Sequence, residues 1–247
     1  MSPPHQMWNN SRPFDRGIEL LDHVEYRLAE TEAEKDAIYR LRYAAYLHEG
    51  AIKPNADYRV TDRFDDLPNS WIFGVFCEGV LTSSIRISVA TPEHPETPST
   101  NVFPDLLRPE LARGKVLVDP TRFVADPARA GRFLELPYLT LRLAYLACEH
   151  FDADLGLASV RAEHQGFYRR VFLNSLSPPR DYPGLTKRIG LMAIDFPGMR
   201  EKVFTRYPYL RSSYAERRAL FKRAIPVAAP RDVPEFQYAR ASIIPSS

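Results

Sequence analysis

The alternation of apolar and polar positions predicts a domain that contains both strands and helices. Residues 24–29 alternate as a half-buried strand does, and the segment 31–48 opens with a capping-box pattern and continues at helical spacing. Residues 71–77 and 80–89 are rich in apolar side chains and flank the turn Glu78-Gly79, which predicts a β-hairpin. The first part of the chain is therefore expected to be strand, helix and hairpin.

The second half continues with strands and helices in alternation. We expect these elements in order: a polar loop at 91–100, a strand at 115–119, a helix over 136–150, a strand at 155–160, a short helix over 163–172 and a last strand at 188–196. This order is typical of a mixed α/β sheet, and the hairpin argues against a doubly wound nucleotide-binding fold. The chain also lacks a G-x-G-x-x-G or Walker loop.

Proline placement and length divide the chain into four segments. Both ends, residues 1–20 and 224–247, are rich in proline and poor in periodicity, so we expect extended tails there. A chain of 247 residues is long enough for one sizeable core, which we place in 21–197. We expect residues 198–223 to form one or two basic helices that pack on this domain.

Composition favours a soluble protein of the cytoplasm. No apolar stretch approaches the roughly 18 to 20 residues that cross a membrane, and the N-terminal residues lack the apolar segment of a secretory signal. The two cysteines, Cys77 and Cys148, lie in apolar segments and are too few for a disulfide framework or a zinc site. We interpret both as core thiols and expect no metal site.

Basic residues concentrate towards the C-terminal end. Residues 200–240 hold ten Lys and Arg against four Asp and Glu, whereas the net charge of the whole chain is only +2. A basic face attracts acidic partners, which include nucleic acid, anionic lipid headgroups and acidic carrier proteins. A solvated basic helix without any partner fits these residues equally well.

Several charged side chains fall where a small α/β domain should be apolar. Arg86 lies inside an apolar strand, and Arg42 and Tyr46 share a helix face because they are four residues apart. A guanidinium in the middle of a strand usually pairs with a carboxylate or faces a cleft, because an unpaired buried charge is strongly destabilising. Taken alone, an arginine such as Arg42 is more often a solvated helix residue than a site residue.

Two further pairs of polar residues supply acidic groups. Asp62 and Asp65 lie in the loop before the hairpin, where they could instead cap a turn. Asp119 and Arg122 close a predicted strand, and Pro120 between them indicates a bulge or a splayed edge. Strand ends that open into a crevice bind ligands in α/β sheets, so we expect one polar site here. A purely structural ion pair of Asp119 with Arg122 is the alternative.

The order and spacing of these residues resemble a known pattern. Acyl-homoserine lactone synthases carry Arg-x-x-x-Phe, Asp-x-x-Asp, a strand Arg and Glu-x-x-Arg, and this chain has Arg42-x-x-x-Tyr46, Asp62-x-x-Asp65, Arg86 and Asp119-x-x-Arg122. Its His164-x-x-Phe167-Tyr168 resembles a helix start in the related long-chain N-acyl amino acid synthases, the FeeM-like group. Both groups belong to the GNAT acyltransferase superfamily. The resemblance covers about residues 24–196 and implies a GNAT-like α/β (α+β) fold, with a mixed, mostly antiparallel sheet flanked by helices.

Departures from the two patterns favour the N-acyl amino acid synthases. The tryptophan that homoserine lactone synthases carry after the helix arginine is Ile52 here, and Asp119 replaces their longer acid. The coenzyme A phosphate loop of many GNAT enzymes is not clearly present, since Arg129-Ala-Gly131-Arg132 matches it poorly. The resemblance therefore implies acyl carrier protein as the donor, no further cofactor and no nucleic acid.

The implied reaction moves a long-chain fatty acyl group from acyl carrier protein to the amine of an amino acid. Asp119 would help to take the amine proton, Arg122 and Arg86 would hold the site and the acceptor's carboxylate, and Arg42 and Asp65 would support them. Backbone amides at the strand opening would stabilise the oxyanion.

Tyr168 would donate a proton to the departing thiolate, and an ordinary helix aromatic explains it equally well. His164 is either a polar residue of the helix start or a group of the substrate site, and Tyr46 and Asp62 are assigned to the substrate site without a fixed role. A second aromatic of the helix start, Phe167, is given no role.

Acidic carrier protein would dock on the basic segment at Arg217 and Arg218. Other interpretations stay open: formation of acyl-homoserine lactone from S-adenosylmethionine, acylation of ornithine for a lipid, and a catalytically silent domain that binds acyl carriers. A peripheral contact of the basic segment with a membrane surface also stays open.

Overall fold

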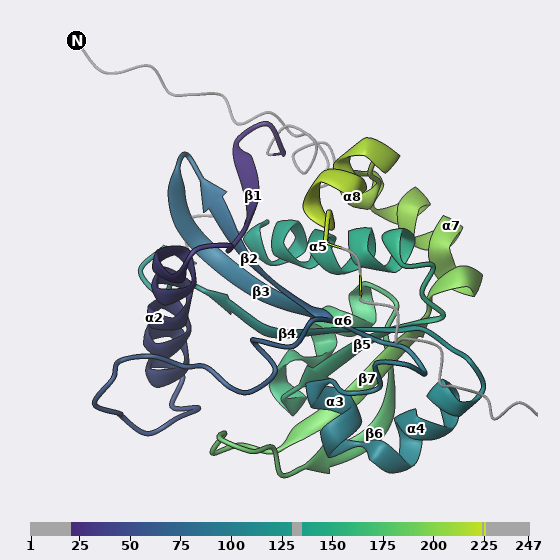
Figure 1. Cartoon of the computed structure of the whole chain (residues 1–247), viewed down its shortest axis with the longest axis horizontal. Helices are drawn as coiled ribbons and strands as arrows, with labels where there is room; N and C mark the ends of the chain where they lie inside the picture. Colours follow the sequence, from purple (N-terminus) through teal and green to yellow (C-terminus); the bar gives the residue numbers. More distant parts are fainter. Residues whose placement is uncertain (1–20, 130–134, 224, 226–247) are drawn as a thin grey trace, which may run out of the picture.

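The structure is a computed structural model, and it describes residues 21–129, 135–223 and 225 of the chain. One mixed sheet of seven strands forms the centre of this described part (Figure 1). Its strands lie in the order β1-β2-β3-β4-β5-β7-β6, and every neighbouring pair is antiparallel except β4 with β5. They are β1 (Val24–Leu28), β2 (Ser70–Cys77), β3 (Val80–Ala90), β4 (Leu117–Ala125), β5 (Leu155–Val160), β6 (Asn174–Arg180) and β7 (Ile189–Asp195).

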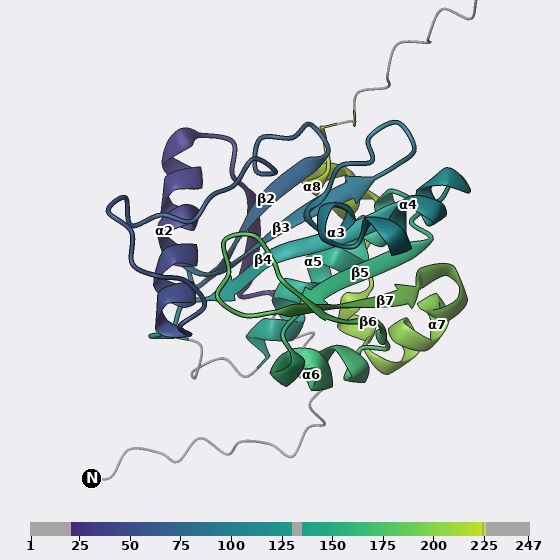
Figure 2. The same ribbon diagram turned by 90° about the horizontal axis from the view of Figure 1, so that it is seen from below.

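Helices cover both faces of the sheet (Figures 1 and 2). α5, α7 and α8 lie on one face, while α2, α3 and α4 lie on the other. Their bounds are α2 (Glu32–His48), α3 (Pro98–Val102), α4 (Pro104–Ala112), α5 (Leu136–His150), α6 (Gln165–Arg170), α7 (Phe196–Arg206) and α8 (Tyr214–Leu220), with 3-10 turns η2 (Ala162–His164) and η3 (Pro208–Leu210).

The period of two along β3 assigns its side chains to opposite faces of the sheet. Ile85 and Ile87 enter the main hydrophobic core, which also contains Leu143 of α5 and Phe204 of α7. Arg86 between them points to the opposite face, towards α2, and it is fully buried there. This alternation puts a guanidinium at the centre of the sheet without disturbing the apolar core.

The sheet opens between β4 and β5. These parallel strands pair only at Leu117 with Leu155 and at Val118 with Gly156, and they diverge beyond that point. β4 also bulges, because the register with β3 shifts between Ser84 and Arg86 and Arg122 has a left-handed φ of 53°. Splay and bulge together create an opening in the middle of the sheet (Figure 2).

Most of the predicted elements are confirmed. Thr31 caps α2 with a reciprocal capping box to Glu34, and β2 and β3 form the expected hairpin. Cys77 and Cys148 are buried free thiols, as interpreted from the sequence.

Within the described residues, no helix is long and apolar enough to cross a bilayer, and no group of His, Cys, Asp and Glu side chains is arranged to hold a metal ion.

Three predictions about elements were wrong. The polar loop expected at 91–100 ends in α3, and α4 follows it directly, because Thr97 forms a capping box that the proline-rich composition obscures. The strand expected at 115–119 continues to Ala125, because β4 pairs with β5 only as far as Val118 and Pro120 therefore interrupts no backbone pairing with β5. β6 was missed because its sequence contains Pro178 and Pro179. The predicted tails, apart from Ile225, and part of the loop 129–132 lie outside the described residues.

Candidate active site

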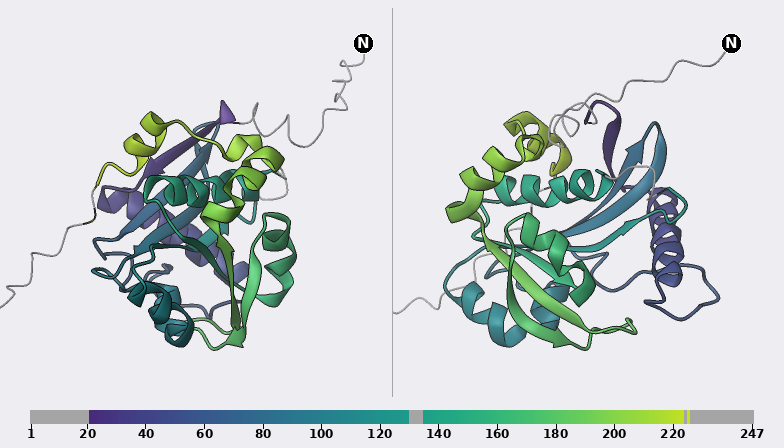
Figure 3. Two further views of the ribbon diagram at one scale, coloured as in Figure 1. Left: turned by 90° about the vertical axis from the view of Figure 1, so that its right-hand side faces the viewer. Right: turned by 180° about the vertical axis from the view of Figure 1, so that it is seen from behind.

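A cavity of about 530 Å³ lies where β4 and β5 separate. The end of α2, the bulged half of β4, the end of β5, the start of α6 and the loop before β7 surround it. The right-hand view of Figure 3 looks at the molecule from behind, and α6 lies towards the viewer there. Most of the wall is apolar, and its polar members include Tyr46, Thr121, Arg122, Ser159, Arg161 and Tyr168.

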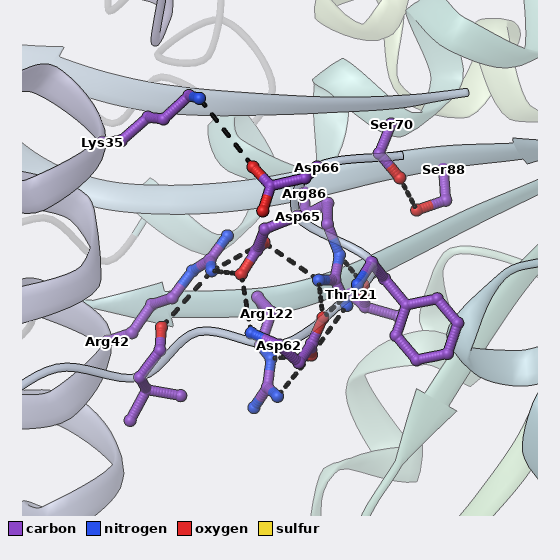
Figure 4. A network of polar contacts seen from close by, with 12 residues as sticks. Lys35, Arg42, Asp62, Asp65, Asp66, Ser70, Arg86, Ser88, Thr121 and Arg122 are labelled. Carbon is purple, nitrogen blue, oxygen red and sulfur yellow. Dashed lines mark hydrogen bonds and ion pairs between the residues drawn. The ribbon is translucent and has the colours of Figure 1, made fainter. Parts of the chain in front are cut away.

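A network of three arginines and two aspartates lies behind one end of this cavity (Figure 4). Nη1 of Arg42 donates to both carboxylate oxygens of Asp65 at 2.9 Å, and Nη1 of Arg86 donates to Oδ1 of Asp65 at 2.9 Å. Arg86 also bonds Asp62 at 2.5 Å, and Nη2 of Arg122 donates to Oδ2 of Asp62 at 2.6 Å. Three separate elements and the loop before β2 are thereby joined.

Local hydrogen bonds hold the two aspartates in place. The backbone N–H of Asp62 donates to Oδ2 of Asp65 at 3.0 Å, and the N–H of Phe64 donates to Oδ1 of Asp62 at 2.9 Å. Such short-range bonds are the turn-forming habit of Asp, so the capping role considered from the sequence is real. It coexists with the ion pairs, because each carboxylate has lone pairs for both sets of partners.

The ion pairs of Asp62 and Arg122 outweigh the effect of burial on the pKa values of these two groups. Burial alone would raise the pKa of Asp62, but Arg86 and Arg122 outweigh burial and hold that pKa at about 2. Burial alone would lower the pKa of Arg122, but Tyr46 and Asp62 raise it above its ordinary value. For Arg42, burial dominates and lowers the pKa, and Asp65 opposes it.

The network carries one excess positive charge, because three guanidinium groups face two carboxylates. Arg122 alone among these five residues lines the cavity, and its guanidinium lies 5.6 Å from the ring centre of Tyr46. Arg42, Asp65 and Arg86 lie behind it, so Arg86 supports Arg122 rather than facing the cavity. An unbalanced guanidinium in a mostly apolar wall can bind a carboxylate or stabilise a developing oxyanion.

Asp119 lies apart from this network. Its side chain is fully buried, does not line the cavity, and accepts hydrogen bonds from the backbone N–H and the hydroxyl of Ser99 at 2.8 and 2.6 Å. Burial raises the pKa of Asp119, although these bonds oppose the rise. The ion pair of Asp119 with Arg122 that the sequence left open is replaced by separate partners, Ser99 and Asp62.

The other predicted residues occupy different depths. Tyr168 lines the cavity and is nearly fully buried, and burial raises its pKa well above the ordinary value. His164 lies at the rim, where its Nε2 is 3.9 Å from the carboxylate of Glu49. Arg217 and Arg218 do not line the cavity, and Arg217 is bound to Glu149 at 3.1 Å.

Sequence reasoning missed four residues near the site. Ser159 of β5 and Arg161 of the turn after it line the cavity, and Ser99 donates a hydrogen bond to Asp119. Tyr182 lies in the loop before β7, and the charges of Asp119 and Arg122 influence its pKa. A serine in a strand or a tyrosine in a loop carries no chemical signal of its own. Only the fold brings these side chains to the opening.

Comparison with known proteins shows the family of the chain. The sequence model of the N-acyl amino acid synthase FeeM matches residues 37–195, well over half of the chain. The protein belongs to this family. The matched region runs from α2 to the end of β7, so it contains the ion network and the walls of the cavity that those elements form.

Solved structures agree on the fold. FeeM itself, from uncultured soil microbes, is 18% identical with a TM-score of 0.59, over 74% of this chain and 96% of FeeM. The acyl-homoserine lactone synthases BjaI and LasI are both 14% identical, with TM-scores of 0.52 and 0.53, over 75% and 84% of this chain and 89% and 99% of theirs. No curated protein sequence matches the chain significantly.

The comparisons confirm the predicted family and the GNAT-like α+β fold. Members of the FeeM family are N-acyl amino acid synthases, so the chain belongs to a family of acyltransferases. The ion network and the cavity therefore form the candidate active site of an acyltransferase.

Proposed function

We propose that the protein transfers a long-chain fatty acyl group from acyl carrier protein to the amine of an amino acid. The observation that carries this proposal is the mostly apolar cavity at the β4/β5 opening, with the single network cation Arg122 in its wall. Apolar walls suit the acyl chain, and the cation suits an acceptor that carries a carboxylate.

The chemistry requires alignment more than activation. In the reaction the amine nitrogen forms a bond to the thioester carbon, the carbon–sulfur bond breaks, and one amine proton ends on the departing thiolate. A thioester is already reactive, so the protein must hold the amine neutral and close to the carbonyl. Backbone amides of the bulge at Arg122 and Phe123, which lies in the cavity wall, would stabilise the oxyanion.

The excess charge of the network supports an acidic acceptor. In the described part of the chain Nε and Nη2 of Arg122 are engaged by Asp62, and no hydrogen bond occupies Nη1. Asp62 and Arg86 fix the orientation of the group from behind. A carboxylate placed against Nη1 would neutralise the remaining charge and point the amine of the same amino acid into the cavity.

The test is mass spectrometry of lipid extracts from cells that express the wild-type chain, the Arg122→Ala variant or the Arg113→Ala variant. Arg113 is an exposed arginine directly after α4 and serves as the matched control. We expect N-acyl amino acids with the wild type and with Arg113→Ala, and at least about tenfold less with Arg122→Ala, because a charged hydrogen bond contributes about 1.5 to 3 kcal/mol.

Two outcomes would contradict the proposal. Equal product from wild type and Arg122→Ala would remove Arg122 from the site. Acyl-homoserine lactone with release of methylthioadenosine would show a different acceptor. Circular dichroism of each purified variant establishes that the Arg122→Ala chain is folded.

A further inference from the structure

We propose that the acceptor's proton leaves the cavity through two serine hydroxyls, Ser159 and then Ser99, and ends on the buried carboxylate of Asp119. In this arrangement Ser159 contacts the amine, and Asp119 and Ser99 act through it. The inference rests on the proposed function, and it adds two residues, Ser99 and Ser159, that neither the ion network nor the family pattern includes.

The three side chains form a continuous hydrogen-bonded chain. Oδ1 of Asp119 accepts from the hydroxyl of Ser99 at 2.6 Å, and the hydroxyls of Ser99 and Ser159 are 2.7 Å apart. Ser99 is fully buried, whereas Ser159 is half-buried and lines the cavity. The chain therefore connects a carboxylate that the cavity does not reach with the cavity wall.

The splay of the sheet explains why the three residues meet. Asp119 is the first residue of β4 beyond its last pair with β5, and Ser159 lies near the end of β5. The strands have already separated there, and α3 inserts Ser99 across the gap. Where the backbone pairing of β4 with β5 stops, side-chain hydrogen bonds through Ser99 connect the two strands.

Donor and acceptor counting sets the direction of the relay. An ionised Asp119 only accepts, so Ser99 uses its single proton on Asp119 and must accept the proton of Ser159. Ser159 then turns oxygen lone pairs to the cavity, where an ammonium group can donate. The ammonium N–H bond breaks, each serine passes on its own proton while gaining another, and an O–H bond forms on Asp119. The neutral amine that remains is the nucleophile of the acyl transfer.

The surroundings of Asp119 favour its role as proton acceptor. Burial raises the pKa of Asp119, while hydrogen bonds from Ser99 and Thr97 and the charge of Arg86 on β3 oppose the rise. The negative charge of Asp119 also helps to raise the pKa of the Tyr182 phenol, in the loop before β7. Among the charged groups of the described residues, Arg86 has the largest effect on the pKa of Asp119.

Glu49 is the rival base. It is the one carboxylate among the described residues that line the cavity, but it is paired with Arg161 at the rim and its side chain is 47% exposed. Arg161 already engages this carboxylate at the exposed rim, so it is less well placed than the Ser159 hydroxyl to receive a proton inside the cavity. Replacing it with Gln tests this rival directly.

The experiment measures turnover by the purified full-length chain with palmitoyl-acyl carrier protein and a mixture of the amino acids, with the product identified by mass. Variants are Ser159→Ala, Ser159→Thr, Asp119→Asn, the double variant of Ser159→Ala with Asp119→Asn, and Glu49→Gln. The matched control is Ser70→Ala, which breaks a 2.7 Å hydrogen bond between two buried serines, neither of which lines the cavity.

We expect kcat to fall about 100-fold in Ser159→Ala and Asp119→Asn, since positioned proton transfer contributes 10²-fold or more. The double variant should lose no more than either single one, because both changes cut the same path. The wild-type pH profile should level off once Asp119 is ionised, whereas these variants should keep gaining rate up to the pH at which the free amine loses its proton. Ser159→Thr should restore the wild-type profile, and Ser70→Ala should keep it.

A wild-type pH profile in Ser159→Ala, or losses that multiply in the double variant, would overturn the relay while leaving the proposed function intact. A change of profile in Glu49→Gln instead would assign the base to Glu49 and also overturn it. Wild-type protein that makes no N-acyl amino acid would contradict the proposed function itself and the relay with it.

Discussion

Individual residues of the ion network depend on one another for stability. Asp65 is nearly fully buried and is the only carboxylate that joins Arg42 to Arg86 in the described residues. Buried pairs of this kind gain little over apolar packing, but loss of one partner leaves a charge that nothing balances. The network is thus fragile at its central member, and its fragility can be measured.

We predict that Asp65→Asn lowers the free energy of unfolding by about 3 to 5 kcal/mol, because Arg42 and Arg86 then repel each other without a shared anion. Urea unfolding at neutral pH measures this change. Asp66→Asn is the control, since the neighbouring Asp66 is 80% exposed and lies 4.0 Å from Lys35. An equal effect of both substitutions would show that the network does not stabilise the fold.

Among the elements, α8 is followed by a C-cap residue, Phe221, that belongs to the main hydrophobic core. Phe221, which follows α8, packs against Trp71, Phe73 and Phe151 with ring-centre distances of 6.0, 5.4 and 5.4 Å. These rings lie on β2 and after α5, so the basic segment shares the main core of the domain. α8 itself buries none of its own residues, and the adjacent phenylalanine anchors it.

We predict that Phe221→Ala destabilises the protein by about 3 to 5 kcal/mol, the usual cost of emptying a buried aromatic site. Tyr214→Ala is the matched control on the same helix, because the side chain of Tyr214 is 68% exposed. Thermal unfolding followed by circular dichroism compares the two. Wild-type stability in Phe221→Ala would mean that the segment is not part of the cooperative unit.

At the scale of the whole molecule, several exposed basic residues lie on α7 and α8 and directly after α8. α7 and α8 lie on the α5 side of the sheet, away from α3 and α4 (Figure 3). Their exposed basic residues include Lys202 on α7 and Arg218 on α8, and Lys222 lies just after α8. Arg217 is engaged inside the fold by Glu149 and Ser212, so its replacement would disturb packing as well as charge. Arg218 is therefore the residue that tests docking of an acidic carrier.

We predict that Arg218→Glu raises the KM for acyl-acyl carrier protein severalfold at low salt, with kcat nearly unchanged, because surface charge acts mainly on encounter. Steady-state kinetics with Arg113→Glu as the control measures this. A short acyl-pantetheine thioester should react equally well with wild type and both variants. An unchanged KM for the carrier would place its docking surface elsewhere.

The sequence alone determined the elements whose periodicity is strong and the members of the ion network. Arg86 was predictable because a guanidinium inside an apolar strand must find a partner, whereas Arg42, Asp62, Asp65 and Arg122 were grouped with it through the resemblance to the acyl-homoserine lactone synthase pattern. Only the tertiary structure decided that Asp119 pairs with Ser99, that Ser159 faces the cavity, and that α3 fills the gap in the sheet. Serines and short proline-rich segments carry little local signal, and their roles arise from contacts between residues 20 to 60 positions apart.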